Sequence, residues 1–196
     1  MKSISGSHIH QYIIRKMKST IPSSLLFIFF LCIIFYAPLP ALCTSLYESL
    51  CNEYRPEEDI PKCLNLLKND SKIPLATNYH DLSQYILEKA LNEAILIETN
   101  YTELVKRFDT DKAISNCAYE FYNAAIGGLK SALNELENDP RSARIDAITA
   151  ASEVNDCEKA LGDTPASVID PSIRERNNEI YFISLMSSLA IIHLFS

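Results

Sequence analysis

Apolar residues recur at three- and four-residue spacing over most of the chain from position 78 onward, which indicates helices that each bury one face. This pattern predicts helices over residues 78–108, from Asp109 or Asp111 to about 138, over 141–160 and over 172–194. Asn78 is suited to capping the first helix, and Pro140 disfavours helical geometry at the residue before it. Short connections make consecutive helices antiparallel, so the expected fold is an all-α, up-down-up-down four-helix bundle over residues 76–196.

The residues expected to face the bundle interior follow this spacing. In the first helix they are Leu82, Ile86, Ala90, Ala94, Ile97, Tyr101, Leu104, Val105 and Phe108, with Leu87 and Leu96 at the edge; in the second, Ile114, Cys117, Phe121, Ala124, Ala125, Leu129, Ala132 and Leu136; in the third, Ile145, Ile148, Ala151, Val154 and Cys157. The pair Gly127 and Gly128 lowers the helix propensity by on the order of 2 kcal/mol relative to alanine. A close approach by a neighbouring helix would account for that pair.

The last predicted helix has Pro171 at its first turn and is almost wholly apolar from Ile180 to Phe195. Two interpretations compete for this segment. A glycolipid-anchor signal would need a small-residue cleavage site and a polar spacer upstream. A buried bundle helix would explain the interrupting polar residues, Ser184, Ser187, Ser188 and His193, as a narrow polar stripe. We favour the buried helix, because without it the other three helices would have uncovered apolar faces.

Residues 44–75 are expected to form a helical hairpin that precedes the bundle. Pro56 and Pro61 interrupt this segment, which has few apolar residues of its own. A disulfide between Cys51 and Cys63 would clamp the hairpin and contribute about 3 kcal/mol in the chain-entropy model.

Residues 1–43 have the order of a secretory signal peptide. Basic residues at 15, 16 and 18 precede an apolar run from Leu25 to Ala37, which is too short to span a membrane, and small residues follow. We expect cleavage after Cys43, and translation from Met17 would by itself give a complete signal peptide. The alternative is an N-terminal membrane anchor, which we disfavour because no charged stop-transfer segment follows the run.

Four of the six cysteines follow the predicted cleavage site: Cys51, Cys63, Cys117 and Cys157. In an oxidising compartment they predict two disulfides, for which three pairings are possible. A metal site is disfavoured, because there is no C-x2-C pair and the histidines of this part lie far from the cysteines in sequence. The sequons at Asn69 and Asn100 are candidate N-glycosylation sites and agree with secretion.

The charge of the chain bears on the kind of partner. The whole chain has a formal net charge of −7, and residues 1–43 hold four of its 18 basic residues and no acidic residue. Residues 44–196 therefore carry 14 basic against 25 acidic residues, a net charge of −11. Nucleic acid is disfavoured as a partner because a chain of this sign repels phosphates. A basic protein partner is favoured, and the alternative is a charged surface that serves solubility alone.

The sequence contains no motif for hydrolysis, phosphate binding or metal-dependent catalysis. His80 and His193 are expected to be surface or core residues rather than catalytic bases. The carboxylate pairs Glu88 with Glu93 and Glu98 with Glu103 are expected on solvated helix faces, since glycoside hydrolysis would need them across a cleft. We therefore expect no enzymatic activity and no cofactor, and a function that resides in a protein-binding surface.

The cysteine positions and helix order together resemble the plant family of invertase and pectin methylesterase inhibitors. The segments that carry the resemblance are Leu50-Cys51, Pro61-Lys62-Cys63, the Cys117 helix, Asn155-Asp156-Cys157-Glu158, and Arg176-Asn177-Asn178-Glu179 before the apolar terminus. They cover essentially all of residues 44–196 and are also similar to an invertase-inhibitor-like subgroup of pollen allergens. Each segment alone is a weak signal, and their order is the specific one.

The resemblance implies disulfides Cys51–Cys63 and Cys117–Cys157, secretion into the plant cell wall and a four-helix bundle preceded by a helical hairpin. It also implies one of two partners, pectin methylesterase or invertase, inhibited in a one-to-one complex that covers the active-site cleft of the enzyme. No membrane association is implied after removal of the signal peptide.

The corner Asp139-Pro140-Arg141-Ser142 bears on the choice of target. Invertase inhibitors of this family typically carry Pro-Lys-Phe at that corner, and the motif enters the invertase cleft. Here Pro140 matches, Arg141 keeps the positive charge, and Ser142 lacks the aromatic ring that would anchor the contact. We therefore favour pectin methylesterase as the target, with invertase as the alternative. A non-inhibitory binding or pollen protein that keeps the fold is a third possibility.

Overall fold

The computed structural model describes residues 44–108, 111–162, 164 and 168–195. The predicted signal peptide with its Cys43 cleavage site and Met17 start, and the helix start at Asp109, lie outside these residues. The described part is helical and contains no strand. None of its helices is long and apolar enough to cross a membrane.

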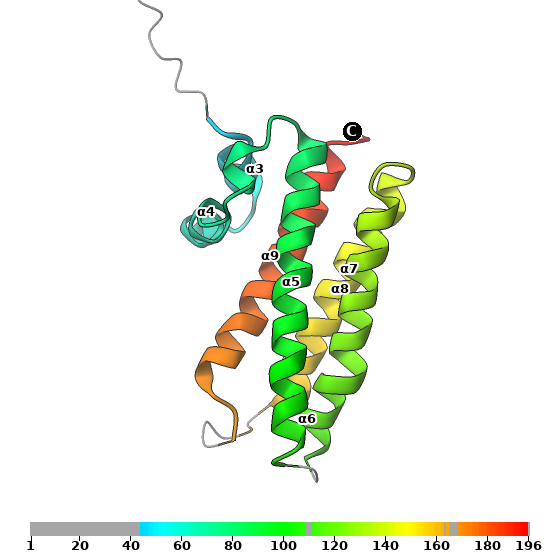
Figure 1. Cartoon of the computed structure of the whole chain (residues 1–196). Coiled ribbons are helices and arrows are strands. Elements are labelled where there is room, and N and C mark those ends of the chain that lie inside the picture. Colours follow the sequence, from blue (N-terminus) through cyan, green and yellow to red (C-terminus); the bar gives the residue numbers. More distant parts are fainter. Residues whose placement is uncertain (1–43, 109–110, 163, 165–167, 196) are drawn as a thin grey trace, which may run out of the picture. The chain divides into compact units, whose positions relative to one another are not determined.

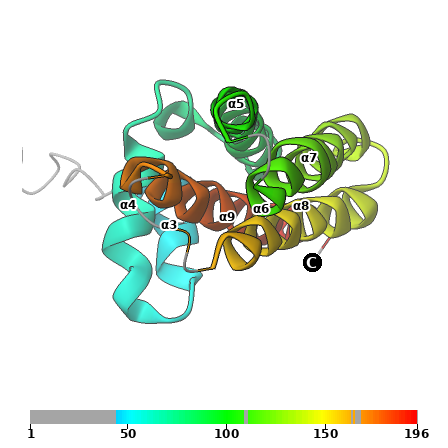
Figure 2. The ribbon, with the colours of Figure 1, turned by 90° about the horizontal axis from the view of Figure 1, so that it is seen from below.

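Four long helices form the predicted bundle. They are α5 (Tyr79–Val105), α7 (Tyr122–Glu135), α8 (Pro140–Leu161) and α9 (Pro171–Ile192). Helices α5, α7, α8 and α9 each pack against the next, and α9 closes the bundle against α5 (Figures 1 and 2). The up-down-up-down arrangement expected from the sequence is confirmed.

Polar side chains cap the starts of these helices. The Asn78 side chain accepts a hydrogen bond from the Asp81 amide at 2.9 Å, as predicted. Asp111 likewise caps the short helix α6 (Lys112–Asn116), which opens the second arm of the bundle. The third and fourth helices begin at Pro140 and Pro171, one residue before the predicted starts, because proline is favoured in the first turn.

The second predicted bundle helix is not one uninterrupted α-helix. A π-helical turn, η3 (Cys117–Phe121), separates α6 from α7. Such a turn contains one extra residue and advances the helix face by one position. Tyr122 is therefore buried in place of the predicted Phe121, which is only partly buried, and Ala124 is exposed.

The inner face of α8 is formed by small residues. Ala143, Ala147, Ala150 and Val154 are buried, whereas Ile145 and Ile148, predicted to face inward, are 61% and 37% exposed. The predicted inward orientation of these two isoleucines is wrong. The reason is a close approach of α7: a Cβ on Gly128 would lie 3.1 Å from the Asp146 carbonyl oxygen and 3.4 Å from the Ala150 Cβ. At this spacing only small side chains fit between the two helices.

Gly128 thus provides the close approach expected for the glycine pair, whereas a Cβ added to Gly127 would have no neighbouring atom within 4 Å.

On α5 the predicted inner face is buried as far as Tyr101, and Leu87 is also buried. Leu96, which was expected to widen that face, is 46% exposed. It lies on the side of α5 that faces solvent.

Helix α9 is the central helix of the described fold. Residues from Ile180 to Ile191 are largely buried, because α5 and α8 cover one side and the N-terminal hairpin contacts the other (Figure 2). The buried serines fit a helix covered on all sides. The Ser187 and Ser188 hydroxyls donate to carbonyls three residues earlier in α9, at 2.7 and 2.8 Å. The prediction of a buried bundle helix is confirmed.

The hairpin before the bundle consists of α3 (Leu46–Glu53) and α4 (Ile60–Lys68). A buried disulfide joins Cys51 to Cys63, and a second joins Cys117 in η3 to Cys157 in α8. These are the two pairings that the family resemblance implied. The hairpin packs against α9 at Phe182. The centre of the Phe182 ring lies 5.1 Å from that of Tyr54, in an edge-to-face arrangement, and 4.9 Å from the ammonium of Lys62. His193 adds a 2.9 Å contact to Glu53 at the end of α3.

Candidate partner-binding surface

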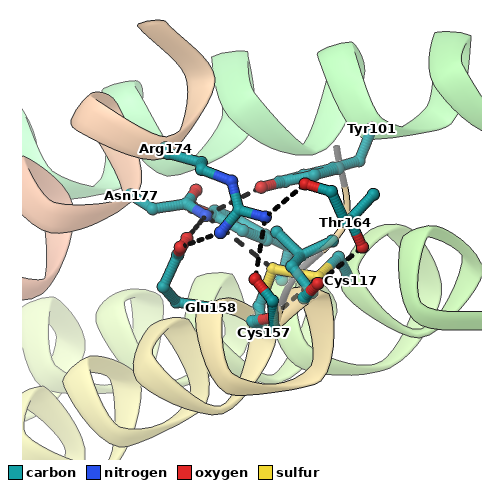
Figure 3. Close-up of polar contacts among 10 residues, drawn as sticks. Tyr101, Cys117, Cys157, Glu158, Thr164, Arg174 and Asn177 are labelled. Carbon is teal, nitrogen blue, oxygen red and sulfur yellow. Dashed lines mark hydrogen bonds and ion pairs between the residues drawn. A yellow bond between two sulfur atoms is a disulfide. The ribbon is translucent and has the colours of Figure 1, made fainter. Parts of the chain in front are cut away.

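A buried polar network joins the start of α9 to the three other bundle helices (Figure 3). Asn177 is 1% exposed and lies at its centre. Its Oδ1 accepts a hydrogen bond from the Tyr122 hydroxyl at 2.6 Å. Its Nδ2 donates to the Tyr101 hydroxyl at 2.7 Å and to Glu158 Oε2 at 3.0 Å. The hydrogen bond between Asn177 and Glu158 therefore joins two of the segments that carry the family resemblance, residues 155–158 and 176–179.

Arg174 extends the network to the connection between α8 and α9. Its guanidinium pairs with Glu158 and donates to the carbonyl oxygens of Gly162 and Thr164, both at 3.1 Å. Burial raises the pKa of the Tyr101 and Tyr122 hydroxyls well above their usual range. These groups therefore stay protonated at physiological pH, and their arrangement suits fixing the helices rather than proton transfer.

The predicted partner-binding corner is a capped helix start. Asp139 Oδ1 accepts from the Ser142 amide at 3.2 Å, and the Ser142 hydroxyl donates to Asp139 Oδ2 at 2.8 Å. These bonds lower the pKa of the Asp139 carboxyl. Pro140 and Ser142 are half-buried, and Arg141 is exposed with its guanidinium 5.4 Å from the centre of the Phe195 ring. The corner therefore presents a positive charge at the start of α8, and its third position, Ser142, has no aromatic ring.

A stripe of outward-facing residues continues from this corner along α8. We call Arg141, Ile145, Ile148 and Ser152 the outer stripe of α8; all four are exposed and are spaced four, three and four residues apart. That spacing places them on one helix face, opposite the buried alanines. The outer stripe thus has a cation at one end and two large apolar side chains in the middle.

Several carboxylates lie close together along the seam where η3 and α7 meet α8. Loss of hydration, and then the nearby charges of Asp146 and Asp139, raise the pKa of Glu135. Further along, loss of hydration together with Asp156 and Glu120 raises the pKa of Glu153. We call Glu120, Glu135, Asp146, Glu153 and Asp156 the seam carboxylates. Of these five, Asp156 pairs with a lysine, Lys159, at 2.7 Å.

The four carboxylates considered for glycoside hydrolysis each contact a different side chain, and none contacts the other member of its pair. Glu88 pairs with Lys72 at 2.7 Å and Glu93 with Arg176 at 3.7 Å. Glu98 accepts from Thr102, and Glu103 pairs with Lys106. Within the described residues, no group of three or more histidine, cysteine or acidic side chains could hold a metal ion. His80 is half-buried near Asp81, and His193 contacts Glu53.

The two sequons lie in different surroundings. Asn69 is exposed at the end of α4, where its amide donates to Asn65 at 3.3 Å. Asn100 is half-buried in α5, next to the buried Tyr101, on the rim of a surface depression that Leu104 and Ile173 also line. Both asparagines remain candidate glycosylation sites.

Comparison with known proteins returned no matching family model and no matching curated protein. The assignment of a function therefore depends on the residues themselves. Sequence reasoning missed the outer stripe, because hydrophobicity ranks isoleucine above alanine for the interior. The regular spacing of Ala143, Ala147, Ala150 and Val154, opposite the glycine pair of α7, was the signal that could have identified it.

Proposed function

We propose that this chain is a secreted plant protein that inhibits pectin methylesterase by forming a one-to-one complex over the enzyme's active-site cleft. Residues 1–43 would be its signal peptide, and the cell wall would be its compartment. The proposal is supported by the ordered set of family-like segments, from Leu50-Cys51 to Arg176-Asn177-Asn178-Glu179. A helical scaffold with two buried disulfides is compatible with an inhibitor that must stay folded outside the cell.

The observation that carries the choice of pectin methylesterase is the corner at Pro140. Ser142 uses its hydroxyl to cap α8 and supplies no aromatic anchor for an invertase cleft. The net charge of −11 over residues 44–196 favours a basic enzyme as the partner, because opposite charges attract across an interface.

Methanol release measures this activity directly. The purified protein is titrated into plant pectin methylesterases at mildly acidic pH, and we expect inhibition that saturates at one equivalent. Unchanged methanol release across a panel of isoforms that includes basic and acidic enzymes would overturn the proposal.

Invertase is the second candidate, since Pro140 and the exposed Arg141 preserve two of the three positions of the family's usual corner. Sucrose hydrolysis in the presence of excess protein distinguishes the two targets. A non-inhibitory binding or pollen protein is the third candidate, and recovery of either enzyme with the immobilised protein from a cell-wall extract would exclude it.

A further inference from the structure

The two N-glycosylation sequons differ in the room that the fold leaves for a sugar. An N-linked glycan is bulky and hydrated, so it must project from the folded protein into solvent. A sequon that carries one is therefore expected in a surface turn or loop. Of the two asparagines, Asn69 lies in a turn and Asn100 lies inside a long helix. The fold thus separates two candidates that the sequence leaves equal.

Asn69 lies where α4 ends, and its side chain is exposed. Its amide nitrogen donates a hydrogen bond to the exposed side chain of Asn65 at 3.3 Å. The turn that follows is held by Asp70, whose Oδ1 accepts from the backbone amides of Lys72 and Ile73 at 2.7 and 3.1 Å. A sugar on Asn69 would therefore displace a contact on the surface and leave the turn intact.

Asn100 lies inside α5, and its side chain is half-buried. It lines a surface depression between α5 and the start of α9, together with Leu104 and Ile173. The next residue, Tyr101, is buried and accepts a hydrogen bond from Asn177 of α9 at 2.7 Å, which holds the two helices together here. A glycan on Asn100 would begin in this depression, where the helices would confine it and apolar side chains would replace part of its hydration.

We propose that Asn69 is the glycosylated asparagine of the secreted protein and that Asn100 carries no glycan. The sugar would extend into solvent from the end of α4, the second helix of the N-terminal hairpin. This inference rests on secretion, which is part of the proposed function, and it does not depend on the identity of the target enzyme.

The full chain is expressed with its own residues 1–43 in a eukaryotic secretory host. The secreted protein is analysed by intact mass, and by peptide mapping after enzymatic glycan release in heavy-oxygen water, which labels each asparagine that carried a glycan. Asn69→Gln and Ser71→Ala remove the first sequon, and Asn100→Gln and Thr102→Ala remove the second. The two alanine variants keep the asparagine, so they separate loss of the glycan from loss of the amide side chain. The melting temperature of each variant verifies folding.

We expect the wild type to carry the mass of one glycan. Asn69→Gln and Ser71→Ala should lose that mass completely, whereas Asn100→Gln and Thr102→Ala should keep it. A glycosidase should also remove the sugar from the folded protein, because Asn69 is exposed.

The outcomes separate this inference from the proposed function. Labelling at Asn100 would overturn the inference, and so would a secreted, folded protein without a sugar at Asn69. A chain that residues 1–43 fail to secrete would contradict the proposed function. The same protein secreted with a foreign signal peptide would then still decide between the two asparagines.

Discussion

Asn177 is the centre of the buried polar network of the bundle. It makes hydrogen bonds to groups from α5, α7 and α8, and its side chain is nearly inaccessible. A buried network of this kind is favourable only while every member has a partner, because an unpaired buried polar group carries its full desolvation cost. The network therefore fixes the position of α9 relative to the other three helices.

Replacing Asn177 with leucine keeps the side-chain size and removes all three hydrogen bonds. The Tyr101 and Tyr122 hydroxyls and one oxygen of Glu158 would lose a partner in the interior. We expect the free energy of unfolding to fall by about 3 kcal/mol, which corresponds to a decrease in melting temperature of roughly 6–12 °C for a domain of this size. Thermal and urea unfolding measure the change.

Asn178 is the natural control, because it is the next residue in the sequence and is exposed. Asn178→Leu should change stability by less than about 0.5 kcal/mol. Equal losses for the two variants would contradict a special role of the network and would instead reflect the insertion of leucine into the start of α9.

The packing of α7 against α8 is an element-scale property that two adjacent glycines report. A Cβ on Gly127 would have no neighbouring atom within 4 Å, whereas a Cβ on Gly128 would press on the backbone of α8. Gly127→Ala should therefore stabilise the protein by about 0.5–1 kcal/mol through helix propensity. Gly128→Ala should destabilise it by about 1–2 kcal/mol, because the helices must move apart. Urea unfolding of both variants tests this, and opposite signs are required.

The disulfides make a second element-scale prediction. Cys51 and Cys63 are 12 residues apart in the sequence, and Cys117 and Cys157 are 40 residues apart. The chain-entropy model gives about 3 kcal/mol for the first loop and about 4 kcal/mol for the second. Replacing Cys117 and Cys157 with alanine should therefore destabilise the protein more than replacing Cys51 and Cys63, as measured by urea unfolding. Loss of the Cys51–Cys63 disulfide should lower the protection of backbone amides from hydrogen exchange in α3 and α4. Equal amide protection of α3 and α4 in the two variants would contradict this expectation.

The element pattern shows where sequence reasoning works and where it does not. The 3.6-residue periodicity of α5 was sufficient, because its inner face consists of large residues such as Leu82, Ile86 and Ile97. On α8 the same reasoning ranked Ile145 and Ile148 above the alanines by hydrophobicity. Distance between helices decided the outcome instead, and periodicity within one helix carries no information about that distance.

The π turn shows the same limit. The sequence of Cys117–Phe121 does not indicate an extra residue in this turn. The turn places Cys117 opposite Cys157 and Tyr122 opposite Asn177, and these contacts exist only in the assembled bundle. The corner and the disulfides were found in the sequence. The outer stripe and the seam carboxylates appeared only with the packing of the helices.

At the scale of the whole molecule, two sets of carboxyl groups act on stability in opposite directions. Helix caps and ion pairs lower the pKa of Glu48, Glu88, Asp139 and Asp170. Folding is favoured by these groups above their unfolded pKa values, near pH 4 to 4.5, and that contribution is lost as the pH falls through their folded values. Glu135 and Glu153 have raised pKa values, so the folded protein holds their protons more tightly. Their contribution is present below about pH 4.5 and is lost as the pH rises through their folded values.

Buried tyrosines limit stability at the alkaline end. Because burial raises the pKa of Tyr101 and Tyr122, the folded protein keeps both hydroxyls neutral, whereas the unfolded chain ionises them above about pH 10. Stability should therefore fall again above that pH.

These opposing effects predict a maximum of stability in the mildly acidic range, with a decline toward neutral pH caused by the seam carboxylates. The double variant Glu135→Gln, Glu153→Gln removes the two ionisations responsible for that decline, and it should gain stability relative to the wild type at pH 7 but not at pH 4.5. Urea midpoints of both proteins at a series of pH values measure the difference. Glu137→Gln controls for the general loss of negative charge, because Glu137 is an exposed residue close to the same corner. If Glu137→Gln stabilises the protein at pH 7 as much as the double variant does, the decline reflects the net charge of the chain rather than the lost hydration and neighbouring charges of Glu135 and Glu153.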